Sequence, residues 1–344
     1  MRLGVWIIAA VGACSGSGPS GDGGDGGTDT DTDTDTQTDG TTPTTGETGT
    51  TPTSTGDTGP TTTEPTFDCS APKPTNPRPF VSYDIVTTED FDFDALGSMV
   101  YSDWVNFVAV DSYGEFSVIA PGIEDTRGIQ IMSDGNIAAA YITQGRLGYT
   151  DRLTGASYTL LAGLSAPNAL DIGHDDIMFV TEAGNGRVTR FDPATGEHAV
   201  IATGFTYPNG IALNQEQNRL FVADSTQGVY MLELNESTGE WGPQQLLFNP
   251  PGSESYDGIE VDYCGNVYVV QFYNGELHRF NPDTLVGELL IDLDDSQSFL
   301  WNSVRWGSNR GIWSRTTLYV TDRHKVFGVD IGIPGRDQPV DLVP

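Results

Sequence analysis

The chain of 344 residues carries 16 basic and 48 acidic side chains, which gives a formal net charge of −32. Nucleic acid backbones are bound by basic surfaces, so this charge excludes DNA and RNA as partners. Without Arg2 and the ten acidic residues between Asp22 and Glu64, the charge is still about −23. The remainder therefore has an acidic surface, which either is simply solvated or attracts cations to a concave region.

The first 13 residues are typical of an export signal peptide. Arg2 precedes an apolar run of about eleven residues, whereas a helix that spans a bilayer needs about 20. The sequence Val11-Gly12-Ala13-Cys14 resembles the lipobox of bacterial lipoproteins, which implies cleavage before Cys14 and lipidation of this cysteine. Ser15 in place of Asp resembles the outer-membrane sorting pattern. We therefore expect a protein of the bacterial cell envelope that touches the membrane only through a lipid anchor, with the outer membrane favoured. A plain secretory signal cut elsewhere would instead give a secreted protein.

Residues 14–66 form a second region of distinct composition. From Ser15 to Thr66 the chain consists almost entirely of Gly, Thr, Asp, Ser and Pro, without an aromatic residue, Lys or Arg. Such a sequence has too little apolar surface to offset the entropy that is lost on ordering. The composition predicts a disordered linker between the anchor and a folded domain of residues 67–344.

The folded part repeats one short phrase, in which a marked residue is followed by a small residue, a large apolar residue, any residue and another apolar residue. The copies are DTRGIQI at Arg127, APNALDI at Asn168, YPNGIAL at Asn209, SYDGIEV at Asp257, LWNSVRW at Asn302 and a weaker ALGSMVY at Gly97. Successive marked positions are 30, 41, 41, 48 and 45 residues apart. These intervals are close to the roughly 40 to 50 residues of a four-stranded propeller blade.

Each copy continues with a polar turn and an apolar strand, as in RLFVAD at 219–224 and VYVVQF at 267–272. A third strand follows behind a Gly turn with period-two alternation. Residues 80–86, FVSYDIV, precede the first phrase and are expected to join the last blade and close the ring. The sequence therefore predicts an all-β fold, a six-bladed β-propeller preceded by a signal peptide and a disordered tether.

The cysteines leave one simple pairing. If Cys14 carries lipid, only Cys69 and Cys264 remain. Export permits a disulfide, although the sequence cannot supply the geometry that it needs. We expect a bridge that ties the entry of the tether to the turn after the first strand of blade five.

The marked residues are expected at one mouth of the central channel, because the first strand of each propeller blade lines the channel. The ring then consists of Gly97, Arg127, Asn168, Asn209, Asp257 and Asn302. Asn and Asp also end turns through local backbone hydrogen bonds, which is a purely structural alternative. Converging carboxamide and carboxylate oxygens are otherwise the ligands of a hard cation such as calcium.

The phrases at Asn168, Asn209 and Asp257, in this order and spacing, resemble the senescence marker protein 30, gluconolactonase and luciferin-regenerating enzyme family. The likeness covers most of residues 95–330. In that family a six-bladed propeller holds one divalent ion, which polarises a lactone carbonyl while an Asp activates water. The resemblance implies that Asn209 and Asp257 bind the metal, that Asp257 is the general base, and that Asn168 contacts the substrate. Asn302 is a third expected metal ligand from its place in the ring.

The sequence departs from this family at blade one. The family supplies a Glu ligand there, whereas Gly97 or Ser98 occupies the place in ALGSMVY. The loss of one carboxylate should weaken calcium binding. Arg127 at the mouth also disfavours a cation, but it suits an acidic ligand.

Two functions follow, and no GxSxG, HExxH, CxxC or phosphate-binding loop competes with them. The first is a hydrolase of lactones or related esters that depends on a divalent metal, expected to be Ca²⁺, with Asp257 as catalytic base. The second is a non-catalytic propeller, similar to NHL-repeat proteins, that binds a small molecule or a protein at the cell surface. The fold alone does not decide between them.

Overall fold

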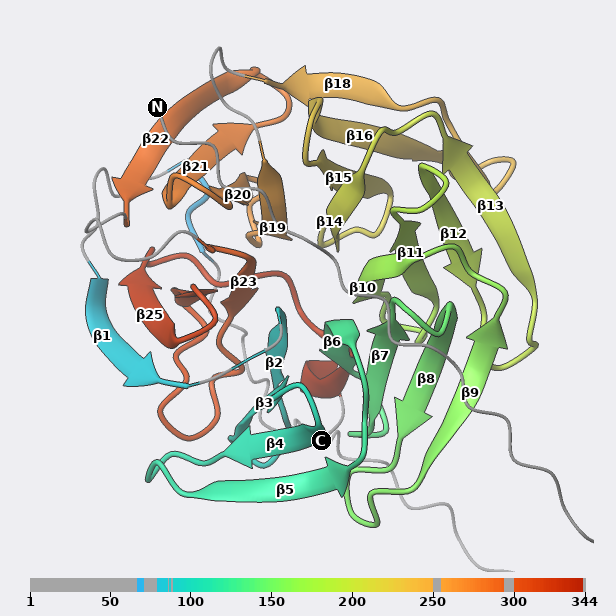
Figure 1. Cartoon of the computed structure of the whole chain (residues 1–344). Coiled ribbons are helices and arrows are strands. Elements are labelled where there is room, and N and C mark those ends of the chain that lie inside the picture. The colour runs from blue at the N-terminus through green and yellow to red at the C-terminus, as the bar shows by residue number, and fades with distance from the viewer. Residues whose placement is uncertain are drawn as a thin grey trace, which may run out of the picture. The chain divides into compact units, whose positions relative to one another are not determined.

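The computed structural model describes residues 67–70, 79–85, 87, 89–249, 255–293 and 300–342. In this part of the chain, six β-sheets stand around a central axis (Figure 1). The expected all-β, six-bladed propeller is therefore confirmed. The predicted signal peptide, the linker and Cys14 lie outside the described residues. Within the described ranges, no helix is long and apolar enough to cross a bilayer.

The blades are antiparallel sheets whose strands follow chain order from the axis outward, except that β1 is the outermost strand of blade six and that two short strands pair with β16 in blade four. Blade one contains β2 (Phe91–Phe93), β3 (Met99–Ser102), β4 (Asn106–Val110) and β5 (Phe116–Pro121). Blade two contains β6 (Thr126–Ile131), β7 (Ile137–Tyr141), β8 (Arg146–Thr150) and β9 (Ser157–Ala162). Blade three contains β10 (Pro167–Ile172), β11 (Met178–Glu182), β12 (Arg187–Phe191) and β13 (His198–Thr203).

The later blades follow the same plan. Blade four contains β14 (Pro208–Leu213), β15 (Arg219–Asp224), β16 (Gly228–Asn235), β17 (Glu240–Trp241) and β18 (Gln245–Phe248). Blade five contains β19 (Tyr256–Val261), β20 (Val267–Gln271), β21 (Glu276–Asn281) and β22 (Val286–Asp292). Blade six contains β23 (Ser303–Trp306), β24 (Thr317–Thr321), β25 (Lys325–Asp330) and, from the other end of the domain, β1 (Pro79–Asp84).

The ring is closed because a strand from the N-terminal end of the domain completes the last blade. β1 pairs antiparallel with β25, with Asp84 opposite Lys325. The prediction that the segment before blade one completes the last blade is confirmed. β1 in blade six and β2 in blade one are consecutive in the sequence. The short segment between them therefore links the last blade directly to the first.

The hydrophobic core lies between neighbouring blades. For example, Phe221 of blade four packs with Tyr256 and Ile259 of blade five, and all three side chains are buried. Full burial of such a side chain contributes about 1.5–3 kcal/mol. The second strands read as nearly continuous apolar runs because adjacent sheets cover both of their faces.

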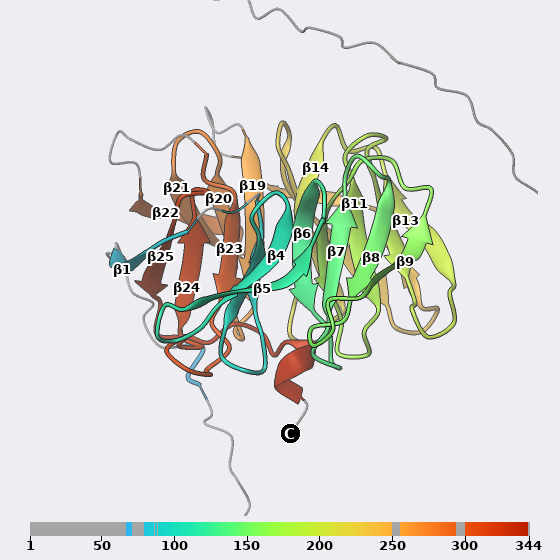
Figure 2. The same ribbon diagram turned by 60° about the horizontal axis from the view of Figure 1, so that its bottom comes forward.

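The C-terminal segment covers the end of the channel at which the inner strands finish. Its 3₁₀ helix η1 (Pro339–Leu342) lies at this end of the ring (Figure 2). Arg336 is buried, donates to the carboxylate of Asp171 and, through its backbone nitrogen, to the carbonyl oxygen of Val261. The channel is therefore blocked on this side, and a ligand has to enter from the other mouth.

Candidate functional site

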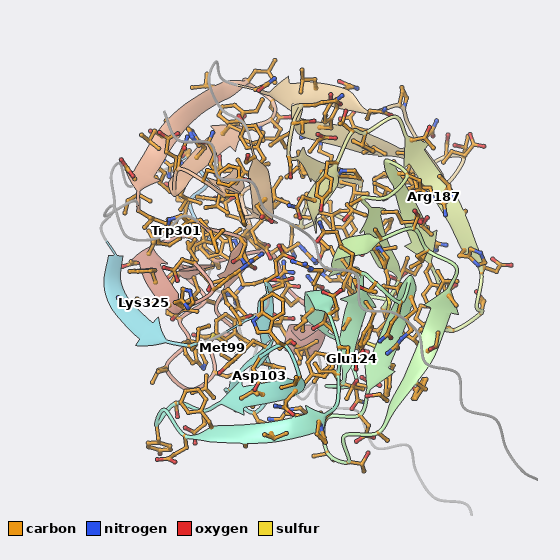
Figure 3. The ribbon with its side chains drawn as sticks, viewed as in Figure 1. Met99, Asp103, Glu124, Arg187, Trp301 and Lys325 are labelled. Atoms are coloured by element: carbon orange, nitrogen blue, oxygen red, sulfur yellow. A yellow bond between two sulfur atoms is a disulfide. The ribbon has the colours of Figure 1, made fainter. Side chains whose placement is uncertain are left out.

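A polar cavity lies at the open mouth of the channel, between the starts of the six inner strands. All five polar residues of the phrase line it: Arg127, Asn168, Asn209, Asp257 and Asn302. Figure 3 shows nitrogen and oxygen atoms gathered at the axis. The free volume is about 20 Å³, which is enough for one or two water molecules. A metal ion fits this space, whereas a larger ligand has to lie above it.

Irregular strand pairing directs the phrase residues toward the axis. In blades two to five, the register between the first and second strands shifts across the phrase, for example between Pro208 and Ile211 around Asn209. An extra residue in one strand re-aims the side chain at that point and is frequent beside active sites. The recurring phrase is thus the sequence of a bulge.

The small residue of the phrase allows neighbouring inner strands to approach each other. A Cβ on Gly128 would lie 2.7 Å from the backbone nitrogen of Leu170 in the next blade. A Cβ on Gly258 would lie 2.8 Å from the carbonyl oxygen of Asn302. Glycine is required here by the close backbone approach, not by its backbone freedom.

The sixth position of the ring is occupied by Glu89, together with Asp90. Both precede β2 and line the cavity, whereas Gly97 lies in the turn between β2 and β3. The assignment of blade one from the sequence, with Gly97 or Ser98 at the mouth, is therefore wrong, and the expected loss of a carboxylate is wrong with it. The inner strand β2 has only three residues and lacks the phrase. The weak copy ALGSMVY instead covers the turn before β3 and the start of β3, which is the second strand of the blade.

Two arginines hold Glu89. Nη1 of Arg127, at the start of β6, donates to Oε2 of Glu89 at 2.6 Å. Nη2 of Arg323, in the turn between β24 and β25, donates to Oε1 at 3.1 Å. The Arg323 guanidinium also lies 5.6 Å from the ring centre of Phe272 and 6.0 Å from that of Trp104. Each oxygen of this carboxylate thus has its own cationic partner.

Asp90 joins three blades. Its carboxylate accepts hydrogen bonds from the hydroxyl of Ser303 in blade six, from the backbone nitrogen of Ile129 in blade two at 3.2 Å, and from Arg305 at 2.7 Å. Arg305 also donates to Glu260 at 2.6 Å. Burial alone would lower the pKa of Arg305, but Asp90 and Glu260 outweigh it and raise this pKa. Asp90 and Arg305 therefore bind each other and neighbouring groups of the channel wall, and they have a structural role.

Other polar side chains of the cavity keep atoms free for a ligand. Asn302 is only 2% exposed, yet within the described part of the chain neither its Oδ1 nor its Nδ2 has a hydrogen-bond partner. Asn209 donates from Nδ2 to Ser225 at 3.3 Å, which leaves its Oδ1 available. Asp257 and Asn168 are also buried. An unpaired buried polar group costs about 1–3 kcal/mol, so this cluster is suited to a polar ligand.

The electrostatic environment of Asp257 favours its neutral form. Burial raises the pKa of Asp257 well above its usual range, and the nearby carboxylate of Glu89 raises it further. Arg323 acts in the opposite direction without cancelling these effects. A carboxyl with a raised pKa is suited to exchange a proton near neutral pH, or to gain a cation as its partner.

The donor set partly fits a hard divalent cation. Carboxylate oxygens of Asp257 and Glu89 and amide oxygens of Asn209 and Asn302 are the ligand types that calcium prefers. The unpaired Oδ1 of Asn302 is an atom that a cation would satisfy. Against this, the described residues contain no cluster of three His, Cys, Asp or Glu side chains that could hold a metal. Glu89 becomes available only if its two arginines release it.

Two aromatic side chains, Tyr207 and Trp104, are candidates for contact with a ligand above the cavity, although neither lines the cavity itself. Tyr207 immediately precedes β14 and Trp104 lies in the turn between β3 and β4, and both are partly exposed. Burial and the charge of Glu89 raise the pKa of Tyr207, and the Trp104 ring centre lies 6.0 Å from the Arg323 guanidinium. These rings offer flat surfaces to a ligand at the mouth.

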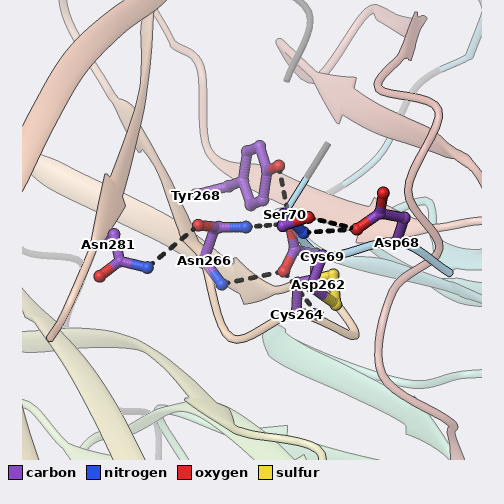
Figure 4. Close-up of a disulfide and its surroundings, with 8 residues drawn as sticks. All are labelled: Asp68, Cys69, Ser70, Asp262, Cys264, Asn266, Tyr268 and Asn281. Carbon is purple, nitrogen blue, oxygen red and sulfur yellow. Dashed lines mark hydrogen bonds between the residues drawn. A yellow bond between two sulfur atoms is a disulfide. The ribbon is translucent and has the colours of Figure 1, made fainter. Parts of the chain in front are cut away.

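The disulfide lies away from the cavity. The structure joins Cys69 to Cys264 with their Cα atoms 5.4 Å apart (Figure 4). Cys264 is in the turn after β19, where Asp262 accepts a hydrogen bond from its backbone nitrogen at 2.9 Å. Asp257 is at the other end of the same strand. The chain before the propeller is therefore tied to the face opposite the open mouth.

Sequence reasoning missed Glu89 and Arg323. For Glu89 an indirect signal was present, because Glu89 directly precedes the alternating acidic and apolar residues of Asp90 to Asp94, a pattern typical of a half-buried strand. Arg323 had no comparable signal, since a turn between two outer strands of a blade reaches the axis only through the tertiary structure.

Residues 159–294 match the family model of the SMP-30/Gluconolactonase/LRE-like region. This match includes the phrases at Asn168, Asn209 and Asp257 but neither blade one nor blade six. The middle of the chain is thus similar to the SMP-30/gluconolactonase family, in agreement with the resemblance seen in the sequence. No curated protein matches the chain.

Solved structures share the fold at low sequence identity. A gluconolactonase of Xanthomonas campestris has a TM-score of 0.60 at 15% identity, covering 77% of this chain and 98% of that chain. Regucalcin of Agrobacterium tumefaciens, described as a calcium-binding protein, has a TM-score of 0.61 at 14% identity, with coverages of 78% and 98%. A virginiamycin B lyase of Staphylococcus aureus, solved with quinupristin, has a TM-score of 0.54 at 14% identity, with coverages of 70% and 79%. At these identities the likeness establishes the propeller fold alone.

Proposed function

We propose that this propeller is a hydrolase of lactones or related esters that depends on a divalent cation, with Ca²⁺ as the expected ion. The observation that carries the proposal is the buried cluster of free oxygens at the mouth, above all the unpaired Asn302 beside Asp257. Asp257, Asn209 and Asn302 would hold the cation, and Glu89 would join them on release from its arginines. The similarity of residues 159–294 to the gluconolactonase family supports the same activity.

In the proposed reaction, Asp257 acts as the base and Asn168 orients the substrate. When bound, the cation would polarise the substrate carbonyl. The cation would also favour the ionised form of Asp257 over the neutral form that burial favours. The Asp257 carboxylate then takes a proton from water as the water oxygen attacks the carbonyl carbon. The ester C–O bond then breaks, and the leaving alkoxide takes the proton back from Asp257. Asn168 lines the cavity and would orient the substrate through its amide.

The proposal includes a cellular location for the protein. The lipobox-like sequence at Cys14 supports anchoring in the bacterial cell envelope. The disulfide ties Cys69 to the face opposite the mouth. A propeller tethered through this end would leave its open mouth free for a small-molecule substrate.

A calcium titration by calorimetry tests the proposal directly. The full-length protein is stripped of metal and compared with Asp257→Ala, and a panel of lactones and esters is assayed with and without calcium. We expect saturable binding and calcium-dependent hydrolysis that are both lost in the variant. Absence of binding to the wild-type protein would remove the electrophile from the mechanism.

One observation favours a second candidate, a non-catalytic propeller that binds a ligand at the same mouth. Both oxygens of Glu89 are engaged by Arg127 and Arg323, so the cavity is stable without a cation. Ligand binding without calcium and without turnover would support this alternative.

A further inference from the structure

The arginines of the channel fall into two groups. Arg305 and Arg336 have side chains that are 7% and 1% exposed, and they donate to Asp90, Glu260 and Asp171 deep in the channel. Arg127 and Arg323 have side chains that are 23% and 18% exposed and are located at the open mouth. The side chains of the second pair are more accessible to a ligand, although Arg305 also lines the cavity.

Two arginines contact one carboxylate at the mouth. Arg127 and Arg323 share the single carboxylate of Glu89 as their close acidic partner, apart from a longer contact of 3.8 Å between Arg127 and Asp125. One arginine would be enough to neutralise Glu89, and the charges of both arginines also act on the nearby Asp257 carboxyl. The Nε atoms of both arginines are buried and without a partner in the described part of the chain. Arg127 lines the cavity, and Arg323 contacts Glu89, which also lines it. Paired guanidinium groups of this kind are typical of carboxylate recognition.

We propose that Arg127 and Arg323 form an anion subsite that binds a free carboxylate on the ligand, so that the preferred substrates are acidic lactones or esters. This inference rests on the proposed function for the reaction, but the subsite itself stands on the two arginines. The reactive carbonyl would lie at Asp257 and Asn302, and the second, non-reacting carboxylate of the same molecule would lie between the guanidinium groups. Tyr207, which directly precedes β14, and Trp104, 6.0 Å from the Arg323 guanidinium, are exposed and would contact the body of the ligand.

The subsite also links the ligand to the cation. A cation that takes Glu89 would release Arg127 and Arg323, and the two freed guanidinium groups would then attract an anion. By thermodynamic reciprocity, the anionic ligand should strengthen cation binding by the same factor. A neutral ligand of the same size makes no such exchange and should leave cation affinity unchanged.

The test is calorimetric binding of three matched polyols to the full-length protein, with and without calcium. D-glucarate carries two carboxylates, D-gluconate carries one and D-glucitol carries none. We expect affinity in that order, and we expect Arg127→Gln and Arg323→Gln each to weaken glucarate binding by about tenfold or more, as for a lost charge-assisted pair. Arg219→Gln is the control, because Arg219 pairs with Glu233 and Asp283 away from the channel.

Several results would overturn the subsite. These are equal binding of glucarate and glucitol, unchanged glucarate binding in both channel variants, or inorganic phosphate binding more tightly than glucarate. If a Gln variant fails to fold, Arg127→Lys and Arg323→Lys keep the charge but lose the planar fork. They are expected to bind glucarate more weakly than the wild type, and wild-type affinity in both would contradict the proposal.

A parallel hydrolysis assay separates this inference from the proposed function. Hydrolysis of neutral lactones without glucarate binding would refute the subsite and leave the hydrolase intact. Glucarate binding that depends on both arginines, without hydrolysis of any lactone, would refute the hydrolase and support the subsite in a binding protein.

Discussion

Glu89→Gln perturbs the centre of the site with the smallest change in shape. Gln retains one acceptor oxygen, so it keeps a hydrogen bond from one of the charged donors, Arg127 or Arg323, and loses the other contact, where its NH2 group cannot accept. Breaking a fully buried ion pair costs about 3–5 kcal/mol, and breaking an exposed one costs about 0.2–1 kcal/mol. The Glu89 side chain is 12% exposed and those of its partners are 23% and 18% exposed. An intermediate loss of about 2 kcal/mol follows from this partial solvation.

Thermal unfolding and calcium titration measure the two consequences. For a domain of this size, about 2 kcal/mol corresponds to a Tm lowered by roughly 3–4 °C in the metal-free protein. If Glu89 also binds the cation, calcium should raise the Tm of the variant much less than that of the wild type. Glu233→Gln is the control, because it removes one partner of the surface ion pair with Arg219. The Tm of this control should change by less than about 2 °C. A Glu89 variant that matches this control in both measurements would refute the role of Glu89.

Four further changes test separate features of the structure. Asn302→Leu should keep or raise the stability of the ligand-free protein, because it removes two unpaired buried atoms, while it abolishes stabilisation by calcium; a large loss of stability without ligand would contradict this. Gly210→Ala should lower the free energy of unfolding, measured by chemical denaturation, by about 1–3 kcal/mol, because its Cβ would lie 2.2 Å from the carbonyl oxygen of Asp257 in the next blade. Gly242→Ala should lower it clearly less, because its Cβ would lie 3.3 Å from the nearest atom. Burial raises the pKa of Asp92 to about 7, so its folded pKa lies above its unfolded value and its ionisation reduces stability as the pH rises from about 4 to 7; Asp92→Asn should flatten this part of the stability curve, and an unchanged slope would exclude the effect. Cys69→Ser opens a loop that spans 195 residues and should destabilise the oxidised protein by about 5 kcal/mol at most, while an equal Tm for variant and wild type would show that the bridge does not contribute.

The sequence by itself determined the repeat, and the repeat determined the fold. The phrases at Arg127, Asn168, Asn209, Asp257 and Asn302 recur at blade length, and each residue occupies an equivalent position on an inner strand, so all five line one cavity. A marked residue followed by glycine is a local signal, because the bulge and the close strand approach act within a few residues. The metal and base roles of these residues remain predictions.

Only the tertiary structure decided which charges surround these residues. Glu89 replaces Gly97 in the ring because β2 is too short to carry the phrase, so its register is set by packing between blades. Arg323 reaches Glu89 from a turn of blade six, across the closure of the ring. Arg336 enters the far end of the channel from the C-terminal segment. Long-range ion pairs of this kind leave no periodic pattern in the sequence, because their partners depend on how the ring closes rather than on local spacing.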